Sequence, residues 1–313
     1  MRIGIDIMGG DFAPEATVLG AILAHKEMSS KDRIVLIGDQ EKANDILSRE
    51  NVDANNFDIV HTTQVIDMYD HPAKAFSKKP DSSIAKGFYL LAKGEIDGFA
   101  SAGSTGAMMV GAMYSVKSIP GIIRPVITGP IPRLDGKHSI LLDVGLNPDT
   151  KPDVLYQYAI LGSLYAKNVY NIENPKVALM NIGSEAGKGN LVTKSAYELM
   201  KDSNDFNFVG NIEANEIFDE GKADVLVCDG FVGNVILKEA EAFYTLYRKR
   251  KLKDEFFDKF NFENYGGTPI LGVNKNIVIG HGISNDVAIK NMILHTREVA
   301  EANLSEKIKE AFK

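Results

Sequence analysis

The sequence predicts an α/β protein with a mostly parallel sheet. Short apolar or β-branched runs alternate with longer segments of helical period along almost the whole chain, which is the pattern of βαβ units. The length of 313 residues suits about two domains or one large α/β unit. One antiparallel arm is expected, because Asp135-Gly136 is a hairpin signal between two apolar runs, 125–131 and 139–144.

The individual elements follow from this alternation. Strands are expected at residues 2–7, 33–37, 57–60, 97–100, 139–144, 176–182, 206–209, 224–228 and 276–279. Helices are expected at residues 15–28, 41–50, 82–93, 105–117, 152–167, 190–201, 232–250 and 284–311. Pro14 and Pro152 fit two of the helix starts. No repeat, linker or change of composition marks a boundary, so we expect residues 1–313 to form a single unit.

The composition is that of an ordinary soluble protein, with 44% hydrophobic residues, 25% charged residues and a net charge of −7. These values argue against disorder and against a basic nucleic-acid-binding protein. The single cysteine, Cys228, excludes an intramolecular disulfide and an all-thiolate metal centre. The six histidines lack HExxH spacing, so we expect no metal and no cofactor. The first residues resemble a strand rather than a leader, which favours a cytoplasmic location.

Six expected strand ends carry glycine beside polar side chains. Ligands of open α/β sheets bind beyond the carboxyl ends of the strands, so these turns form the expected site. Glycine lets a ligand approach the backbone, and a helix that begins there offers free N–H groups to an anion. Any single turn can equally be a simple cap, but six at one edge favour an anion site. The candidate substrate-binding residues are Asp6, Gly9, Gly10, Asp11, Gly103, Ser104, Thr105, Gly106, Asp143, Asn147, Asn181, Asn190, Asp229, Gly230, Gly233 and Asn234.

Familiar nucleotide and nucleophile motifs are missing. Gly9-Gly10 does not form GxGxxG, and 183–189 is one residue short of a P-loop. There is no GxSxG elbow, and Cys228 follows apolar residues, where an inert core thiol is expected. Nucleotide binding and a covalent acyl-enzyme are therefore not indicated. The turn 103–106 is the best phosphate candidate, because its hydroxyls and N–H groups precede an apolar helix.

The strand-end motifs together match one family over nearly the whole chain. They are Asp-Ile-Met-Gly-Gly-Asp at 6–11, Gly-Ser-Thr-Gly-Ala at 103–107, Leu-Asp-Val-Gly-Leu-Asn at 142–147, Lys-Gly-Asn at 188–190, Cys-Asp-Gly-Phe-Val-Gly-Asn at 228–234, Tyr-Gly-Gly at 265–267 and His-Gly at 281–282. On these motifs the sequence resembles the bacterial phosphate acyltransferase family, which makes acyl-phosphate from acyl-acyl carrier protein and inorganic phosphate for phospholipid synthesis. It departs from the family pattern at Ile7, Ser104, Leu146 and Ala214.

The resemblance implies a three-layer α/β/α fold like those of isopropylmalate dehydrogenase and phosphotransacetylase, in a homodimer. It also implies a cytoplasmic enzyme with peripheral membrane contact, whose product a glycerol-3-phosphate acyltransferase consumes. The alternatives are a phosphotransacetylase-like enzyme that uses acyl-coenzyme A, a decarboxylating dehydrogenase of the same architecture, and a non-catalytic membrane-associated scaffold.

The implied reaction is attack of a phosphate oxygen on a thioester carbonyl, which requires positioning and fixed donors rather than a nucleophilic side chain. We expect the turns 103–106 and Gly9-Gly10 to bind phosphate. Lys188 would neutralise charge at the phosphate or the oxyanion, unless it is only a solvated loop lysine. His281 either protonates the leaving thiolate or is a buried structural histidine.

The aspartates and the asparagines among the candidate residues suit different roles. A carboxylate beside phosphate repels it, so the aspartates are expected to cap turns, orient Lys188 or hold the thiol arm. The asparagines are neutral donors that suit either substrate.

Residues 240–265 are expected to form a helical tip. Five bases, Arg248, Lys249, Arg250, Lys251 and Lys253, are followed by Phe256 and Phe257. Aromatic and basic side chains at helical spacing suit a membrane surface or an acidic partner such as acyl carrier protein. The alternative is a dimer-forming or core-packing helix with a solvated charged face. Within this segment, 243–247 are expected to pack internally and 248–262 to be exposed.

Overall fold

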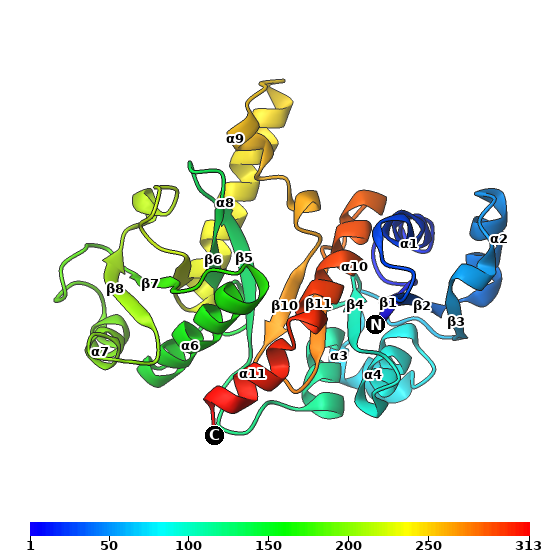
Figure 1. The fold of residues 1–313 in the computed structure, drawn as a ribbon, viewed down its shortest axis with the longest axis horizontal. Coiled ribbons are helices and arrows are strands. Elements are labelled where there is room, and N and C mark those ends of the chain that lie inside the picture. The colour runs from blue at the N-terminus through cyan, green and yellow to red at the C-terminus, as the bar shows by residue number, and fades with distance from the viewer. The chain divides into compact units, whose positions relative to one another are not determined.

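The chain forms two units, each with its own strands. A computed structural model describes all 313 residues. Unit 1 consists of Met1–Ile119 and Phe262–Glu306, and unit 2 of Pro120–Asn261 and Lys307–Lys313 (Figure 1). No change of composition accompanies the passage from one unit to the other, which is why no boundary could be predicted. That residues 1–313 act as one catalytic unit stays a prediction.

The strands of unit 1 lie in the order β3-β2-β1-β4-β11-β10. They are β1 (Arg2–Asp6), β2 (Arg33–Gly38), β3 (Asp58–His61), β4 (Gly98–Ser101), β10 (Thr268–Leu271) and β11 (Asn276–Ile279). Neighbours are parallel except β10 and β11, which are antiparallel. The helices are α1 (Glu15–Glu27), α2 (Gln40–Arg49), α3 (Pro72–Lys78), α4 (Ser83–Lys93), α5 (Thr105–Gly111) and α10 (Asp286–Glu301).

Helices cover both faces of this sheet. Neighbouring residues of a strand point to opposite faces. In β4, Gly98 lies against Thr296 of α10, whereas Phe99 lies against Gly87 of α4. The helices α10 and α4 therefore cover opposite faces, and α1 packs beside α10 in one apolar cluster (Figure 1). This is the three-layer arrangement that the resemblance implies.

The strands of unit 2 lie in the order β5-β6-β9-β7-β8. They are β5 (Val126–Pro132), β6 (His138–Leu142), β7 (Lys176–Met180), β8 (Asn207–Ile212) and β9 (Val225–Val227), and the helices are α6 (Pro152–Val169), α7 (Leu191–Met200), α8 (Gly230–Lys249) and α9 (Glu255–Asp258). Leu142 contacts α6 at Gly162, whereas its neighbour Leu141 shares a cluster with Leu237 of α8. Helices thus cover both faces here too.

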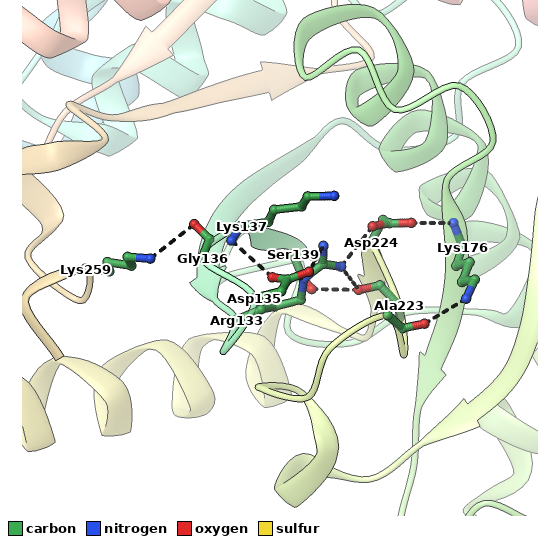
Figure 2. A network of polar contacts seen from close by, with 10 residues as sticks. Arg133, Asp135, Gly136, Lys137, Ser139, Lys176, Ala223, Asp224 and Lys259 are labelled. Atoms are coloured by element: carbon green, nitrogen blue, oxygen red, sulfur yellow. Dashed lines mark hydrogen bonds and ion pairs between the residues drawn. The ribbon is translucent and has the colours of Figure 1, made fainter. Parts of the chain in front are cut away.

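The predicted antiparallel arm is confirmed, because β5 and β6 pair antiparallel across Asp135-Gly136. A buried arginine, Arg133, attaches this arm to the neighbouring strand (Figure 2). Arg133 is 2% exposed and donates to Asp224 Oδ1 at 2.8 Å, to Asp135 at 3.2 Å and to Ala223 O at 2.9 Å. One cation thereby ties the hairpin turn to the strand beside it.

Several expected elements differ from the structure. The helix expected over 284–311 is two helices, α10 and α11 (Leu304–Ala311), because Asn303 takes the left-handed φ of 51°. The helix expected over 105–117 changes after α5 to a π-helical segment, Ala112–Val116. The short elements α3, α9 and β10 were not expected, because each has too few residues to show a helical or strand pattern of apolar positions. Pro152 lies at a helix start as predicted, and no helix is long and apolar enough to span a bilayer.

Candidate active site

Asp6, at the end of β1, is a buried carboxylate that binds its own turn. It is 1% exposed, and its Oδ2 accepts a hydrogen bond from Ser101 Oγ at 2.7 Å. Its Oδ1 accepts the Met8 N–H at 2.9 Å, and Ser83 and Gly9 donate further bonds. Burial raises the pKa of Asp6 above its usual value despite these bonds. The structure therefore supports turn capping among the roles expected for the aspartates.

Two glycine turns of unit 1 touch each other directly. A Cβ added at Gly9 would lie 2.7 Å from Gly103 N and 2.9 Å from Gly103 Cα, so a side chain there cannot be placed without displacement. The Gly103 N–H donates to Ser101 Oγ at 3.0 Å, and the same hydroxyl donates to Asp6. The turns 6–11 and 101–106 consequently lie against each other and share the buried Ser101 and Asp6 side chains.

The second turn leads into α5. Ser104 is its N-cap and accepts the Ala107 N–H at 3.3 Å with a side chain that is almost fully buried. Thr105 is exposed. Gly106 lies against Pro72 of α3, where a Cβ would approach Pro72 Cγ to 2.5 Å. Ser104 thus has a structural role, and Thr105 is the hydroxyl that this turn presents to solvent.

A third turn of unit 1 meets the first. The Asp11 N–H donates to Gly282 O at 2.8 Å, and Gly10 takes the left-handed φ of 104° beside it. His281 is exposed, and its ring lies against Phe262 with centroids 5.2 Å apart. The alternative of a buried structural histidine is therefore wrong. Its role as an acid stays a prediction.

Asp143 in unit 2 repeats the arrangement of Asp6. It is 0% exposed and accepts the Leu146 N–H at 3.2 Å, the Asn147 N–H at 2.6 Å and Asn147 Nδ2 at 3.0 Å. Burial raises the pKa of this carboxyl as well. Each unit therefore has a buried aspartate after a strand that holds its own turn in shape.

The first turn of α8 rests on the Asp143 turn. The Gly230 N–H donates to Asn147 O at 2.8 Å, and at Gly233 a Cβ would collide with the Asp143 carbonyl. Asp229 caps α8 by accepting the Val232 N–H at 2.8 Å. Asn234 is exposed on the next turn of the helix. Two of the predicted turns are again joined by contacts that only glycine allows.

Cys228 precedes this helix and is 4% exposed. Burial raises the pKa of its thiol well above the usual value, so the thiolate is disfavoured. The expected inert core thiol agrees with this geometry.

Lys188 lies in an exposed turn after β7. Its side chain is 49% exposed, and its ammonium lies 3.9 Å from Glu185 Oε1. Asn181 Nδ2 donates to Lys188 O at 3.2 Å and to Asn211 Oδ1 at 3.1 Å, which fastens the turn to β8. Asn190 caps α7 through its side-chain oxygen. Lys188 thus has a long ion-pair distance and lies on a turn that hydrogen bonds attach to β8.

Several supporting residues were not predicted. Ser101 could have been noticed, because a hydroxyl at a strand end precedes a glycine turn. Ser83 and Asn211 come from distant elements and have no local signal. No group of three or more His, Cys, Asp or Glu side chains is arranged to hold a metal ion.

The segment 240–265 is only partly as predicted. Tyr247 is 6% exposed and packs against Phe257 of α9 with ring centroids 5.4 Å apart. Its hydroxyl accepts the Asp254 N–H at 2.6 Å, which folds α9 back beside α8. Phe243 and Leu246 are 59% and 54% exposed, so the expected internal packing of 243–247 is wrong except at its last residue and Tyr244, which stacks on it. Nothing in unit 2 covers that face of α8.

The five bases of this tip are exposed. They are Arg248, Lys249, Arg250, Lys251 and Lys253. Phe257 is 44% exposed and Leu252 is 53% exposed, whereas Phe256 is half-buried against Phe260. The tip therefore presents positive charge and apolar surface together.

Comparison with solved structures shows which class of protein has this fold. The EutD phosphotransacetylase from Staphylococcus aureus superposes with a TM-score of 0.65 at 16% identity over 96% of this chain and 94% of that chain. A branched-chain phosphotransacylase from Enterococcus faecalis V583 gives 0.64 at 16% identity over 96% and 99%. The chain thus has the α/β/α fold found in phosphotransacetylases.

Sequence comparison then gives the family. Residues 1–249 match the family model described as "Fatty acid synthesis protein". Phosphate acyltransferases of Dictyoglomus turgidum and Desulfitobacterium hafniense are 40% and 41% identical, each over 99% of this chain and 97% of their own. The chain belongs to the phosphate acyltransferase family and is an acyltransferase.

Proposed function

We propose that this enzyme transfers a fatty acyl group from acyl carrier protein to inorganic phosphate, giving acyl-phosphate and free carrier protein at an early step of phospholipid synthesis. The observation that carries the proposal is the contact between the turns 6–11 and 101–106 over buried Asp6. Membership of the phosphate acyltransferase family supports it.

Phosphate binds at these turns through backbone N–H groups and the Thr105 hydroxyl. Gly9 and Gly103 are buried against each other, whereas Gly10 is half-buried and Thr105 is exposed, so an anion approaches at Gly10 and at the start of α5. Asp6 lies beneath, and burial raises the pKa of its carboxyl above the usual value. Its hydrogen bonds hold the donors in place before the substrate arrives.

In the reaction a phosphate oxygen attacks the thioester carbonyl carbon. The new C–O bond forms as the C–S bond breaks, and the carrier leaves as a thiolate that takes up a proton. Lys188 offsets the negative charge of the phosphate or the oxyanion, and His281 supplies the proton to sulfur. Both side chains are exposed and therefore accessible to substrate.

Replacement of Lys188 by Ala tests the first role. The variant should fold normally but lose turnover, whereas Lys194→Ala, an exposed lysine on α7, should retain it. A kcat near that of the wild type in the Lys188 variant would remove the assignment. For His281→Gln, an unchanged pH–rate profile would exclude the acid role.

In unit 2, the turns around Asp143 and Asp229 receive the phosphopantetheine arm. Asn234 provides an exposed neutral amide there, and the amide links of the arm need such a partner, whereas Asn147 Nδ2 already donates to Asp143 Oδ2 and Pro125 O. Asp143 acts on the shape of its turn, because its oxygens already accept three hydrogen bonds from the turn.

The tip at 248–257 contacts acyl carrier protein or an anionic membrane. Its five exposed bases attract an acidic surface, and Phe257 and Leu252 add apolar area. The uncovered face of α8, with Phe243 and Leu246, supports a homodimer. The proposal includes a cytoplasmic location with peripheral membrane contact, and a glycerol-3-phosphate acyltransferase would consume the product.

Flotation with anionic vesicles tests the membrane role. Phe256→Glu/Phe257→Glu should lower the bound fraction, and Leu252→Glu serves as a second variant because its side chain is exposed and outside the aromatic cluster. Val209→Glu, exposed on β8, is the matched control. Undiminished binding by both tip variants would contradict membrane contact.

Use of acyl-coenzyme A is the second candidate, favoured by the fold shared with phosphotransacetylases. Comparison of the carrier-bound and coenzyme A thioesters as donors separates the two. A chain that releases no thiol from either donor in the presence of phosphate would instead be a scaffold.

A further inference from the structure

The segment 66–72 of unit 1 borders the proposed phosphate site at two points. The Met68 methyl lies beside Gly282, where a Cβ would be 3.3 Å from Met68 Cε. At the other end of the segment, Pro72 lies against Gly106 of the second turn. The segment therefore contacts both the turn bonded to Asp11 and the turn that starts α5.

Hydrogen bonds and a buried side chain anchor this segment, and exposed apolar side chains lie between the anchors. Lys79 Nζ donates to Val65 O at 2.8 Å and to Asp70 Oδ2 at 2.6 Å, and Ile66 is buried. Between these anchors Met68 is 48% exposed and Tyr69 is 101% exposed. A fully exposed aromatic side chain on a fastened loop has no packing role within unit 1.

Two further exposed apolar side chains adjoin the same turns. Phe12, next to Asp11, is 54% exposed, and Ile283, next to Gly282, is 49% exposed. Because Asp11 and Gly282 are hydrogen-bonded to each other, the two side chains come from adjacent backbone segments. Apolar area is thus concentrated at the edge of a site whose own groups are polar.

We propose that Phe12, Met68, Tyr69 and Ile283 form the subsite for the fatty acyl chain of the thioester. The inference rests on the proposed function. The fatty acyl chain is bonded directly to the carbonyl carbon that phosphate attacks. The first part of that acyl chain must therefore lie on the protein surface beside the phosphate turns. An apolar chain laid against exposed apolar side chains is removed from water, which favours binding in proportion to the area covered. The polar turns therefore select phosphate, and the bordering side chains select a long acyl group.

Chain-length dependence of turnover tests the subsite. With palmitoyl and butyryl carrier protein as donors, Met68→Ser/Tyr69→Ser should lower the ratio of their kcat/KM values at least tenfold, about 1.4 kcal/mol. The rate with the butyryl donor should change less than twofold, as roughly expected for an intact phosphate site. The control is Met113→Ser/Tyr114→Ser, which removes the same exposed pair from the π-helical segment and should leave the ratio unchanged.

A binding measurement gives a second readout. The protein has no tryptophan, so Tyr69→Trp introduces a single reporter. Its emission should shift to the blue with palmitoyl-pantetheine but not with butyryl-pantetheine, and Tyr114→Trp should not respond to either.

An unchanged chain-length ratio in the Met68/Tyr69 variant, or an unresponsive Trp at 69, would overturn the subsite while leaving the proposed reaction intact. Absence of phosphate-dependent thiol release from either donor in the wild type would instead reject the proposed function.

Discussion

Gly9 is the position at which a single methyl group should separate the two phosphate turns. In Gly9→Ala the added Cβ would collide with Asp6 Oδ2 and would lie 2.7 Å from Gly103 N and 2.9 Å from Gly103 Cα, whereas ordinary contacts are 3.4 Å or longer. This overpacking is relieved only if the Asp6 carboxyl or one of the two turns moves by roughly 0.5–1 Å. A displacement of that size in a binding site costs about 100-fold in rate, and overpacking of a buried contact costs about 1–3 kcal/mol of stability.

The assay is phosphate-dependent release of the carrier thiol, with kcat/KM measured against phosphate, together with urea unfolding. Gly187→Ala is the control for stability, because a Cβ there meets nothing within 4 Å and its φ is not in the left-handed region. If Gly9→Ala keeps kcat/KM for phosphate within a factor of about 3 of the wild type, the contact between the turns does not position the phosphate and the reasoning is refuted.

Two other predictions concern buried charges. Burial raises the pKa of Asp6 in the folded state above 3.8, so its contribution to stability is fully present below pH 3.8 and is lost as the pH rises through the raised pKa. The free energy of unfolding of Asp6→Asn, measured relative to that of the wild type, should therefore increase as the pH is raised from 3.8. A difference that does not change with pH would contradict the raised pKa. Arg133→Met removes the cation between Asp135 and Asp224 and should lower the free energy of unfolding by about 3–5 kcal/mol in urea titrations. The exposed pair of Lys222 with Glu216 is the control, since Lys222→Met should have no measurable effect, and equal effects of the two variants would contradict the role of Arg133.

Much of the architecture was predictable because the strands are continuous and apolar. The mostly parallel pairing and the β5–β6 hairpin follow from alternation and from one Asp-Gly pair, whereas the order of the strands was not predicted. The division into two units was not predictable, because unit 1 takes strands from both ends of the chain. The break between α10 and α11 depends on the backbone of one residue, Asn303, which periodicity does not reveal.

The candidate site was predictable as a set of turns but not as a set of contacts. Glycine beside polar residues at strand ends indicated which turns matter, and the structure brings 6–11, 101–106 and 281–282 together in unit 1. Ser83 and Ser101 support Asp6 from other elements, and only the tertiary structure shows this. The exposure of Phe243 and Leu246 was mispredicted because helical spacing does not tell which face of α8 is covered.

In the proposed reaction, phosphate is the acyl acceptor and acyl carrier protein is the donor. The most direct measurement is the release of carrier thiol and the formation of acyl-phosphate from palmitoyl carrier protein, with and without inorganic phosphate. We predict that the two products appear in equal amounts and only when phosphate is present. Thiol release that does not depend on phosphate, or that occurs with coenzyme A thioesters alone, would contradict the proposed function.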